Sequence, residues 1–591
     1  MKEEKNVNDF FKLPIYYNKA KVKLADNIIT DLELCDSINN DPTAKPLYNY
    51  LFNTPNDNND ISKTLTEQVA THYTTDVAYL KDTQQIIREY KTLNNDTYKQ
   101  VMPIKELWDE LKITNGFKEK YYYVDWQAIE FLNKNEIFLQ YLSLYNLFSP
   151  ILSLITPIII LIIPFFILRM RGINLSISEY IRVLKLVAQT NAIGKLFTVN
   201  YSEITTQQSI YIFVSAVFYV YSIYQNINVC VKFNKNMSQI HSYFKDLKLY
   251  LTPTILSMEN YLTYSANLTS QNDFNEVLKI KINTLKMLND KLQNISEYSL
   301  FNISKLKEIG NILKLFYELH TDKIYNDAIM YSLGFHTYIN FIEGLQTNIK
   351  ERKVNFAEFN KKDKKDKKDT KDKNKKNKNI FHKSYYAVLK DDNPIKNTIK
   401  MKKNIIITGP NASGKTTIIK STLINIIFTQ QFGVGFYNLA KLTPFNHIHC
   451  YLNIPDTCGR DSLFQAEARR CKKILDAITE APSDETHFCM FDELYSGTNP
   501  EEAEQSAVAF MNYLTKYNNV SCLLTTHFIN VCKKLQQNKN ILNFHMVTEK
   551  TNNLLNYKYI LKQGITEIKG GINVLTQLNY PKEIINNSLV N

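Results

Sequence analysis

The sequence predicts a C-terminal α/β domain preceded by a mainly α-helical region, and three observations carry this prediction. After residue 380, apolar strand-like runs alternate with helical stretches. Before that point, apolar residues recur at helical spacing. Only 15 glycines and 16 prolines are spread over 591 residues, which favours long helices over many short strands. This length allows two to four domains with separate cores.

Residues 1–136 form the first predicted region, which is polar with helical spacing, as in "DVAYLKDTQQIIREY". The chain opens on charged residues with no apolar run behind them, so we expect no secretory signal. The eight cysteines form no CxxC pair and have no metal-like spacing with histidine. Most lie among apolar neighbours, which is typical of buried free thiols in a reducing, intracellular compartment.

Two stretches without charged side chains define the next region, residues 137–231. One covers 137–168 and contains "ILSLITPIIILIIPFFIL"; the other covers 204–231 around "IYIFVSAVFYVYSIY". Apolar runs of this length are transmembrane candidates, and the alternative is a pair of buried core helices. Prolines recur every seven residues in the first stretch, a feature that membrane helices tolerate better than soluble ones. We expect membrane association with the C-terminal domain facing the cytoplasm; the alternative is a soluble protein.

The connection between these stretches, residues 169–203, carries five basic and two acidic side chains. Positive connections prefer the cytoplasmic side of a membrane. In a simple hairpin with both flanks in the cytoplasm, this basic connection would lie on the opposite side. A re-entrant or interfacial arrangement would remove the conflict, and the sequence leaves both arrangements open.

Residues 232–356 return to amphipathic helices, as the apolar stripe in "YINFIEGL" indicates. A low-complexity linker follows at 357–379, where "NKKDKKDKKDTKDKNKKNKN" holds eleven Lys against four Asp. This net charge of +7 is more than half of the chain's +13, so net charge alone indicates no broad DNA-binding face. We expect the run to be a solvated, disordered linker; a tail that binds lipid or nucleic acid is the alternative.

A phosphate-binding motif, G-x-x-x-x-G-K-[ST], lies in the last region, residues 380–591. It follows the strand-like "NIIIT" and precedes a helix-like run, which is the context it requires. Backbone N–H groups of such a loop hold phosphate oxygens at a helix N-terminus. Lys415 is expected to reach the β- and γ-phosphates of ATP, and the Thr416 hydroxyl to bind Mg²⁺. The residues expected to contact ATP here are Gly409, Pro410, Asn411, Ala412, Ser413, Gly414, Lys415, Thr416 and Thr417.

Two further strand ends complete the expected chemistry. The apolar run "HFCMF" ends in Asp492 and Glu493. Asp492 can hold the magnesium ion, while Glu493 can orient and deprotonate the attacking water. The run "VSCLLTT" ends on His527, at the edge where α/β sheets bind ligands, so this histidine is a candidate to contact the γ-phosphate or the water. Lys415 and His527 therefore join Glu493 as predicted catalytic residues.

Spacing distinguishes among the families that share this motif. Lys415 and Asp492 are 77 residues apart, too few for the helical insertion of transporter-type ABC ATPases, and no LSGGQ segment is present. Residues 380–591 resemble the ATPase domain of the MutS family of mismatch-repair proteins. The resemblance lies in "TGPNASGKTT", "GRDSLFQAEARRCKKILDAI", "DELYSGTNPEEA", "LLTTHF" and the tail "GGINVLTQLNYPKEII". Residues 232–356 are compatible with that family's helical core and lever region.

The resemblance implies an α/β P-loop ATPase domain of the ABC superfamily that works as a homodimer or a MutS-like heterodimer. Ser462 would face the γ-phosphate bound by the other subunit. Asn397, in "NPIKNTI", would contact the adenine, and Tyr559 falls where the family places a residue near the base. The implied function is ATP-driven dimer closure on mismatched or branched DNA, in repair or recombination.

The chain also departs from the family's pattern. The region before 137 is too short for mismatch and connector domains, and the Phe-x-Glu at Phe316 lies within a helical pattern without the preceding Gly-Asp. An alternative function is therefore a membrane-anchored, ATP-driven switch that no longer reads mismatches. A silent scaffold is disfavoured because the expected nucleotide-binding and catalytic residues are all present.

Overall fold

The computed structural model divides the chain into two compact units. Unit 1 comprises 1–98, 256–282 and 330–591, and unit 2 comprises 99–255 and 283–329. The residues described are 6–37, 45–54, 60–93, 98–113, 116–173, 176–188, 205–296, 306–360, 379–452, 454, 462–551, 554–568, 576, 580–581 and 583–584. The region expected at 1–136 is thus shared between both units, as are the helices α10, α11 and α13.

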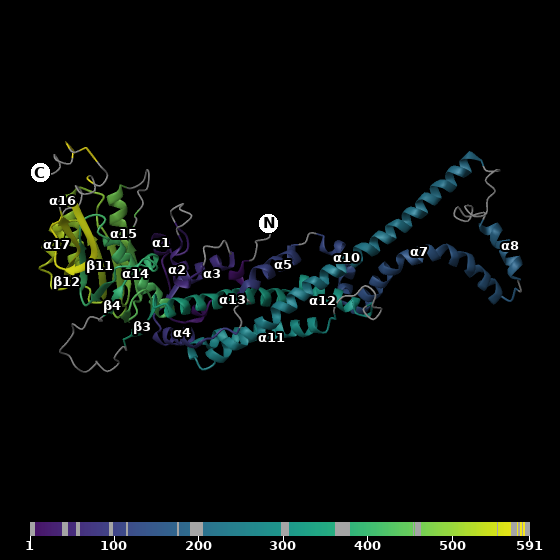
Figure 1. Ribbon diagram of the computed structural model, residues 1–591, viewed down its shortest axis with the longest axis horizontal. Helices are drawn as coiled ribbons and strands as arrows, with labels where there is room; N and C mark the ends of the chain where they lie inside the picture. Colours follow the sequence, from purple (N-terminus) through teal and green to yellow (C-terminus); the bar gives the residue numbers. More distant parts are fainter. Residues whose placement is uncertain are drawn as a thin grey trace. The chain divides into compact units, whose positions relative to one another are not determined.

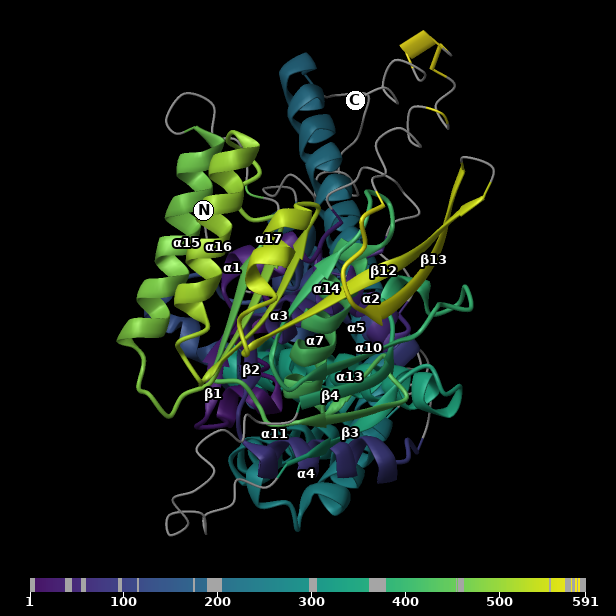
Figure 2. The same cartoon turned by 90° about the vertical axis from the view of Figure 1, so that its left-hand side faces the viewer.

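A six-stranded sheet in unit 1 carries the candidate site, with strand order β13-β12-β6-β11-β10-β9. Its strands are β6 (Asn404–Thr408), β9 (His447–Tyr451), β10 (His487–Asp492), β11 (Val520–Thr526), β12 (Ile541–Thr551) and β13 (Leu554–Gln563). All neighbours pair in parallel except the β12–β13 hairpin, which is antiparallel (Figure 2). The central strands are apolar along their length because both faces of the sheet are covered.

Helices cover the two faces of this sheet (Figures 1 and 2). They are α14 (Lys415–Phe432), α15 (Leu463–Glu480), α16 (Pro500–Leu514) and α17 (Ile529–Leu535). On one face, apolar residues of α15, α16 and α17 pack on β10 and β11 in a continuous buried core. On the other face α14 is almost wholly buried, including both of its glutamines, Gln430 and Gln431. The mixed α/β architecture expected for the C-terminal domain is confirmed.

A second sheet of unit 1 has the order β5-β4-β8-β3-β7. Its strands are β3 (Asn355–Phe359), β4 (Asn379–Ser384), β5 (Asn397–Met401), β7 (Val434–Gly435) and β8 (Leu439–Leu442). β3 and β4 use the two ends of the segment expected to be a linker, and the Lys/Asp run between them lies outside the described residues. β5 leads directly into β6, so this sheet adjoins the start of the glycine-rich loop.

The N-terminal part of unit 1 packs on the far end of α14. Its elements are β1 (Lys21–Lys23), α1 (Asp26–Asp31), α2 (Leu47–Phe52), α3 (Asp60–Thr71), β2 (His72–Thr74) and α4 (Val77–Glu89). The Gln431 amide donates to Val69 O at 2.8 Å and accepts from the Tyr48 hydroxyl at 2.8 Å. The Gln84 amide donates to the carbonyl of Gly433, which follows α14, at 2.7 Å. Buried amides with satisfied bonds fix how these segments fit together.

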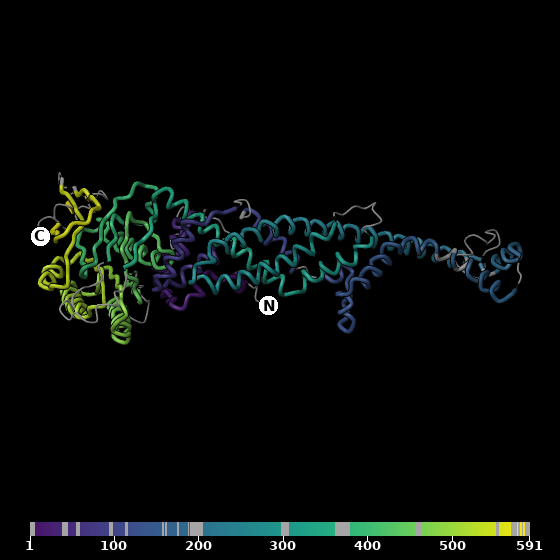
Figure 3. Tube along the Cα trace, turned by 90° about the horizontal axis from the view of Figure 1, so that it is seen from below, coloured from purple at the N-terminus to yellow at the C-terminus, as the bar shows by residue number. Residues whose placement is uncertain are grey.

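Unit 2 is built entirely of helices among the residues that the structure describes. They are α5 (Val101–Ile113), α6 (Phe117–Lys120), α7 (Glu136–Met170), α8 (Ile177–Ala188), α12 (Ile309–Thr321) and the unit 2 parts of α10 (Thr206–Ser265), α11 (Asn272–Gln293) and α13 (Lys323–Lys350). The helical nature expected for this part of the chain is confirmed. The first part of α10 extends beyond its packed portion (Figures 1 and 3).

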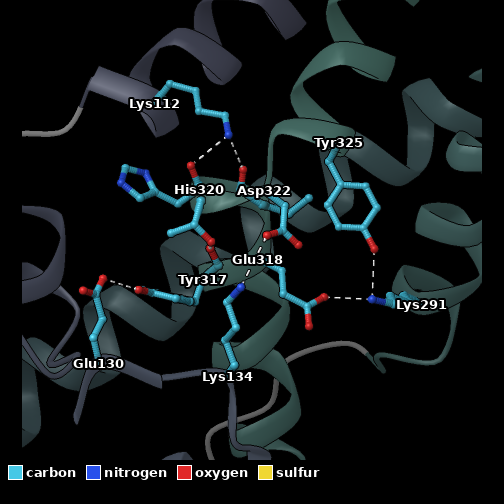
Figure 4. Close-up of polar contacts among 11 residues, drawn as sticks. Lys112, Glu130, Lys134, Lys291, Tyr317, Glu318, His320, Asp322 and Tyr325 are labelled. Carbon is cyan, nitrogen blue, oxygen red and sulfur yellow. Dashed lines mark hydrogen bonds and ion pairs between the residues drawn. The ribbon is translucent and has the colours of Figure 1, made fainter. Parts of the chain in front are cut away.

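The Phe-x-Glu triplet on α12 lies in the interior of unit 2. Phe316 is 1% exposed and packs edge-on against Tyr121, with ring centroids 4.8 Å apart. Glu318 accepts a hydrogen bond from Lys291 at 2.8 Å (Figure 4). Since the phenyl ring belongs to the core, it is not placed to act as a wedge.

The C-terminal end of α12 is capped by a partly buried lysine of α5 (Figure 4). Lys112 Nζ donates to Leu319 O at 2.6 Å and to His320 O at 2.9 Å. These carbonyls belong to the last turn of α12, where no helical N–H follows to pair with them. Burial lowers the pKa of Lys112 to about 8, even though Asp322 lies near enough to oppose this shift.

The low pKa of Lys112 predicts a pH-dependent gain in stability. An unfolded lysine has a pKa of about 10.4, so between about pH 8 and pH 10 the unfolded chain keeps a proton that the folded chain has released. Stability therefore rises with pH across this window. In Lys112→Arg the donors remain but do not titrate, and this gain, about 1–2 kcal/mol for a partly solvated group, should be lost.

Urea unfolding at about pH 8 and about pH 10 measures the pH-dependent gain in stability. The fluorescence of Trp108 and Trp126 in unit 2 follows the unfolding. Lys105→Arg is the matched control, because Lys105 lies on the same helix and forms a local (i, i+4) pair with Asp109. An equal pH response in wild type and Lys112→Arg would show that the amine does not titrate in this window.

Candidate functional site

The glycine-rich loop connects the end of β6 to the start of α14. Gly414 has φ +90°, a conformation that favours glycine, and it immediately precedes the helix. A Cβ on Gly409 would lie 2.7 Å from Ser413 Oγ, so the loop has no room for a larger residue there. The Ser413 hydroxyl is buried and has no hydrogen-bond partner among the residues that the structure describes. The loop thus offers an unpaired polar atom and the N-terminus of an 18-residue helix to an anion.

Lys415 lies folded back over this loop. It is 5% exposed, and its Nζ donates to Gly409 O at 3.0 Å and to Pro410 O at 3.3 Å. Burial lowers the pKa of Lys415, while the nearby Glu493 carboxylate, 3.6 Å from Nζ, opposes that shift. The buried Lys415 ammonium has a carboxylate partner only at this longer distance. When a more highly charged anion enters the loop, the ammonium can leave Glu493 and bind that anion.

Two threonines hold the Asp492 carboxylate at the end of β10. Thr416, at the start of α14, donates to Asp492 Oδ2 at 2.9 Å. Thr525, on the neighbouring strand β11, donates to the other carboxylate oxygen. The arrangement brings a hydroxyl and a carboxylate together beside the loop. Oxygen donors of this kind suit Mg²⁺, which binds to one or two carboxylates plus phosphate oxygens and water.

Glu493 and His527 meet at the same edge, at the ends of β10 and β11. Glu493 Oε1 is 3.4 Å from His527 Nδ1. His527 lowers the pKa of Glu493, and Lys415 adds to this shift, so the side chain is held as a carboxylate. Glu493 has φ +50°, which turns its side chain out of the strand direction. A charged carboxylate at an open edge can accept a proton from water.

The start of α15 is tied to the loop that carries Glu493. Glu467 is 3% exposed and accepts hydrogen bonds from Ser496 Oγ at 3.1 Å and Gly497 N at 3.2 Å. A Cβ on Gly497 would lie 2.6 Å from the Leu463 side chain, so only glycine permits this approach. Ser462 caps α15, accepting from Gln465 N at 3.3 Å, and is itself exposed.

A cavity of about 720 Å³ opens beside these groups. Its walls combine the glycine-rich loop, Asp492 and Glu493 with an apolar end that contains Tyr385 and Tyr386. Tyr559 closes one side: its ring lies 3.1 Å from where a Cβ on Gly414 would be. The volume and the mixture of a polar end with an aromatic end suit a molecule the size of a nucleotide.

Asn397 fixes the strand that carries Tyr559. Its amide donates to Tyr559 O at 2.9 Å and accepts from Leu561 N at 2.8 Å. These bonds connect β5 to β13 and set the backbone of Tyr559, whose φ is +55°. Asn397 also lines the cavity, as its predicted contact with adenine requires. The contact itself stays a prediction.

Comparison with known proteins now identifies this domain. Residues 405–590 match the family profile of MutS domain V. The C-terminal domain belongs to the MutS family. The DNA mismatch repair protein MutS of Staphylococcus haemolyticus is 26% identical over 216 residues, which are 36% of this chain and 24% of that protein. Endonuclease MutS2 of the same species is 27% identical over 208 residues, 34% of this chain and 26% of that protein.

The eukaryotic protein Msh3 of Dictyostelium discoideum is also similar. This DNA mismatch repair protein is 27% identical over 229 residues, 35% of this chain and 16% of its own length. The chain therefore spans about a quarter or less of the relatives it matches. The family profile covers residues 405–590, which lie within unit 1.

The MutS domain brings most of the predicted site residues to one edge of the sheet. The loop residues 411, 412 and 414–417 line the cavity together with Asp492, Glu493, Asn397 and Tyr559. His527 contacts Glu493 without lining the cavity, and Ser462 also lies outside its lining. The "signature" and tail segments of the resemblance fall partly at 455–461 and 569–575, outside the described residues.

Sequence reasoning missed Thr525 and the pair Tyr385–Tyr386. Thr525 stands two residues before His527 in "LLTTH", so a threonine at the end of the strand next to Asp492 was a usable signal. The two tyrosines belong to no motif that we recognised in the sequence, and the packing of η7 (Ala387–Leu389) and β5 brings them to the cavity.

The position of Tyr559 predicts a selective loss of nucleotide affinity. Tyr559→Ala should weaken binding of ATP about fivefold, since a stacked aromatic ring contributes about 1 kcal/mol. Tyr557→Ala on the same strand is the matched control, because Tyr557 is not in the cavity lining. Titration calorimetry measures both. Equal affinities for Tyr559→Ala and wild type would show that the base lies elsewhere.

Proposed function

We propose that this protein is an ATP hydrolase of the P-loop, ABC-superfamily type, in which residues 380–591 bind and hydrolyse ATP with Mg²⁺. The observation that carries the proposal is the meeting of Lys415, Thr416, Asp492 and Glu493 at the edge of a nucleotide-sized cavity. A cradle for phosphate, a metal-binding pair and a charged base are the parts that phosphoryl transfer needs. Mg²⁺ would neutralise charge on the phosphates.

Each side chain has a separate part in this proposal. Lys415 leaves the loop carbonyls and the Glu493 carboxylate for the β- and γ-phosphates. Thr416 and Asp492 would hold Mg²⁺, and the backbone N–H groups of 409 and 411–417 would hold the phosphates. Glu493 then becomes free to orient water and take its proton, with His527 beside it as a partner that keeps the carboxylate charged. Asn397 and Tyr559 hold the base end.

Two copies of this domain close each other's sites in the proposed mechanism. Ser462 stands exposed at the N-terminus of α15, where backbone N–H groups favour an anion, yet it lies outside its own chain's cavity lining. A second subunit, in a homodimer or a MutS-like heterodimer, would bring its Ser462 to the γ-phosphate. Binding of ATP would then draw the two domains together, and hydrolysis would release them.

Mixing two inactive variants tests this shared site. A Lys415→Ala subunit lacks a working phosphate-binding loop but keeps Ser462. A Ser462→Arg subunit keeps the loop but lacks the serine. In a random mixture, half of the dimers combine both subunits and have one intact site out of two, so activity should return to about a quarter of wild type. ATP turnover of the mixture against each variant alone measures the recovery.

The control mixture combines Lys415→Ala with Glu493→Gln. Both changes affect the loop side of the site, so neither mixed site is intact and turnover should stay at background. If the first mixture also stays at background although the variants form dimers, the site is complete within one chain.

DNA is the proposed ligand of the closed dimer, because the similar proteins include DNA mismatch repair proteins. Duplex or branched DNA should raise the rate of ATP hydrolysis several-fold, and the effect should weaken as salt displaces phosphate contacts. Steady-state turnover with and without DNA at two salt concentrations measures this, with Glu493→Gln as the background. Turnover that ignores DNA at both concentrations would contradict DNA coupling.

A second candidate function is an ATP-driven switch held at a membrane that no longer reads mismatches. The observation that favours it is the exposure of two long charge-free stretches, 137–168 in α7 and 206–231 in the first part of α10. The same ATP-binding site would serve this switch, and hydrolysis without any DNA effect would favour it over the first candidate.

A further inference from the structure

Two helices of unit 2 expose apolar side chains where a soluble protein would bury them. α7 and α10 contain the spans Glu136–Ile155 and Ser209–Ser265, which are long and apolar enough to cross a membrane. In the 18-residue apolar window of each span, only 11% and 6% of the residues are buried within the protein. A core helix of a soluble protein would be mostly buried. Over these windows the two helices expose most of their side chains, and they contact each other at Tyr219 and Ser153 rather than forming part of the unit's core.

The exposed surface of each helix is too wide for a single docking face. On α7, Leu154, Ile155 and Ile167 are 52%, 40% and 48% exposed. At about 100° per residue they extend around roughly 200° of the helix. On α10, Tyr211, Val214 and Ile227 are 59%, 43% and 49% exposed and cover a similar arc. A partner helix covers an apolar stripe of about 100°, whereas lipid covers a rod from every side.

Prolines within α7 remove N–H groups, and side chains of the protein replace some of the lost bonds. Pro150 cannot pair with Asn146 O, which instead accepts from Ser149 Oγ at 3.0 Å. Pro157 cannot pair with Ser153 O, which accepts from the Tyr219 hydroxyl of α10 at 3.3 Å. Exposed carbonyls in water would need no such partners. In a bilayer, where no water reaches them, internal partners are what allow a helix to contain proline.

Basic side chains mark where the apolar surface ends. Arg169 and Arg171 follow the charge-free part of α7, and Lys232 is the first charge on α10. Beyond α7, the short helix α8 combines exposed Ile177 and Ile181 with Arg182 and Lys185, and its Tyr180 ring packs on Phe165 with centroids 4.5 Å apart. Helices that mix apolar and basic side chains in this way lie at a membrane surface.

We propose that α7 and the first part of α10 are embedded in the hydrocarbon core of a lipid bilayer, with α8 at the bilayer surface. The proposal extends the membrane-held candidate function and does not depend on ATP hydrolysis. The length agrees with it, since about 20 helical residues cross the hydrocarbon core and α7 has 35. The two helices then need no protein partner along their exposed length.

Flotation of the purified full-length protein with lipid vesicles tests the proposal. Vesicles of phosphatidylcholine with a minor share of phosphatidylglycerol are mixed with detergent-solubilised protein, the detergent is removed, and the vesicles are floated. Wild type should float and should resist washing with high salt and alkaline carbonate. Ile163→Arg combined with Phe218→Arg should lower the carbonate-resistant fraction at least tenfold, because each arginine opposes insertion by about 100-fold.

Ile324→Arg is the matched control, since Ile324 is 67% exposed on α13, outside both charge-free stretches. It should float as wild type does, and all variants should keep the helical circular dichroism of the wild type. Wild type that remains soluble and monodisperse without detergent, or that salt or carbonate removes from vesicles, would overturn the proposal and assign these faces to a second copy or another protein. The ATP turnover assay reports separately on the proposed hydrolase.

Discussion

The hydrogen bond from Thr416 to Asp492 is the contact on which the geometry of the candidate site depends. It joins side chains 76 positions apart in the sequence, from the helix after β6 and the end of β10. β11 lies between these strands in the sheet, so the bond must reach across it, and Thr525 of β11 donates to the same carboxylate. Parallel strands place all these groups at one edge. Any shift of one strand along another would separate them.

A second constraint connects Glu493, the proposed general base, to the start of α15. Glu493 and Tyr495 both have positive φ, a conformation that costs free energy outside glycine. Glu467 and the close approach of Gly497 to Leu463 hold that loop in place. In the proposed dimer, Ser462 at the start of α15 would contact the nucleotide bound by the partner. Because α15 also holds the loop that positions Glu493, a shift of α15 on that contact would move Glu493. Turnover in one site would then depend on the presence of the other subunit.

Sequence patterns predicted the mixed α/β fold of the C-terminal part, because its apolar strands alternate with helices along the chain. Lys415, Asp492 and Glu493 were found from their motifs, and the order of the strands makes them neighbours. The role of Asn397 in holding β13, and the place of Tyr385 at the cavity, depend on packing between segments with no local signal. Phe316 shows the opposite case, in which a short motif match is explained by burial alone. Only the structure shows that α7 is largely exposed rather than a core helix, since the apolar composition of the two kinds of helix is the same.

The N-terminal segment of unit 1 contacts the candidate nucleotide site through α14, a connection that the sequence motifs of the site do not reveal. α14 begins at Lys415 and ends beside Gln430 and Gln431, whose buried amides bond to residues 69–74 and to Phe445. A helix with both ends held moves as a rod, because breaking its own hydrogen bonds costs more than shifting its neighbours. Movement of the phosphate-binding loop along this axis must therefore displace the N-terminal helices, or be resisted by them. In the proposed function, a movement of Lys415 on binding of ATP would be transmitted along the 18 residues of α14 to its far end, which packs on the N-terminal segment.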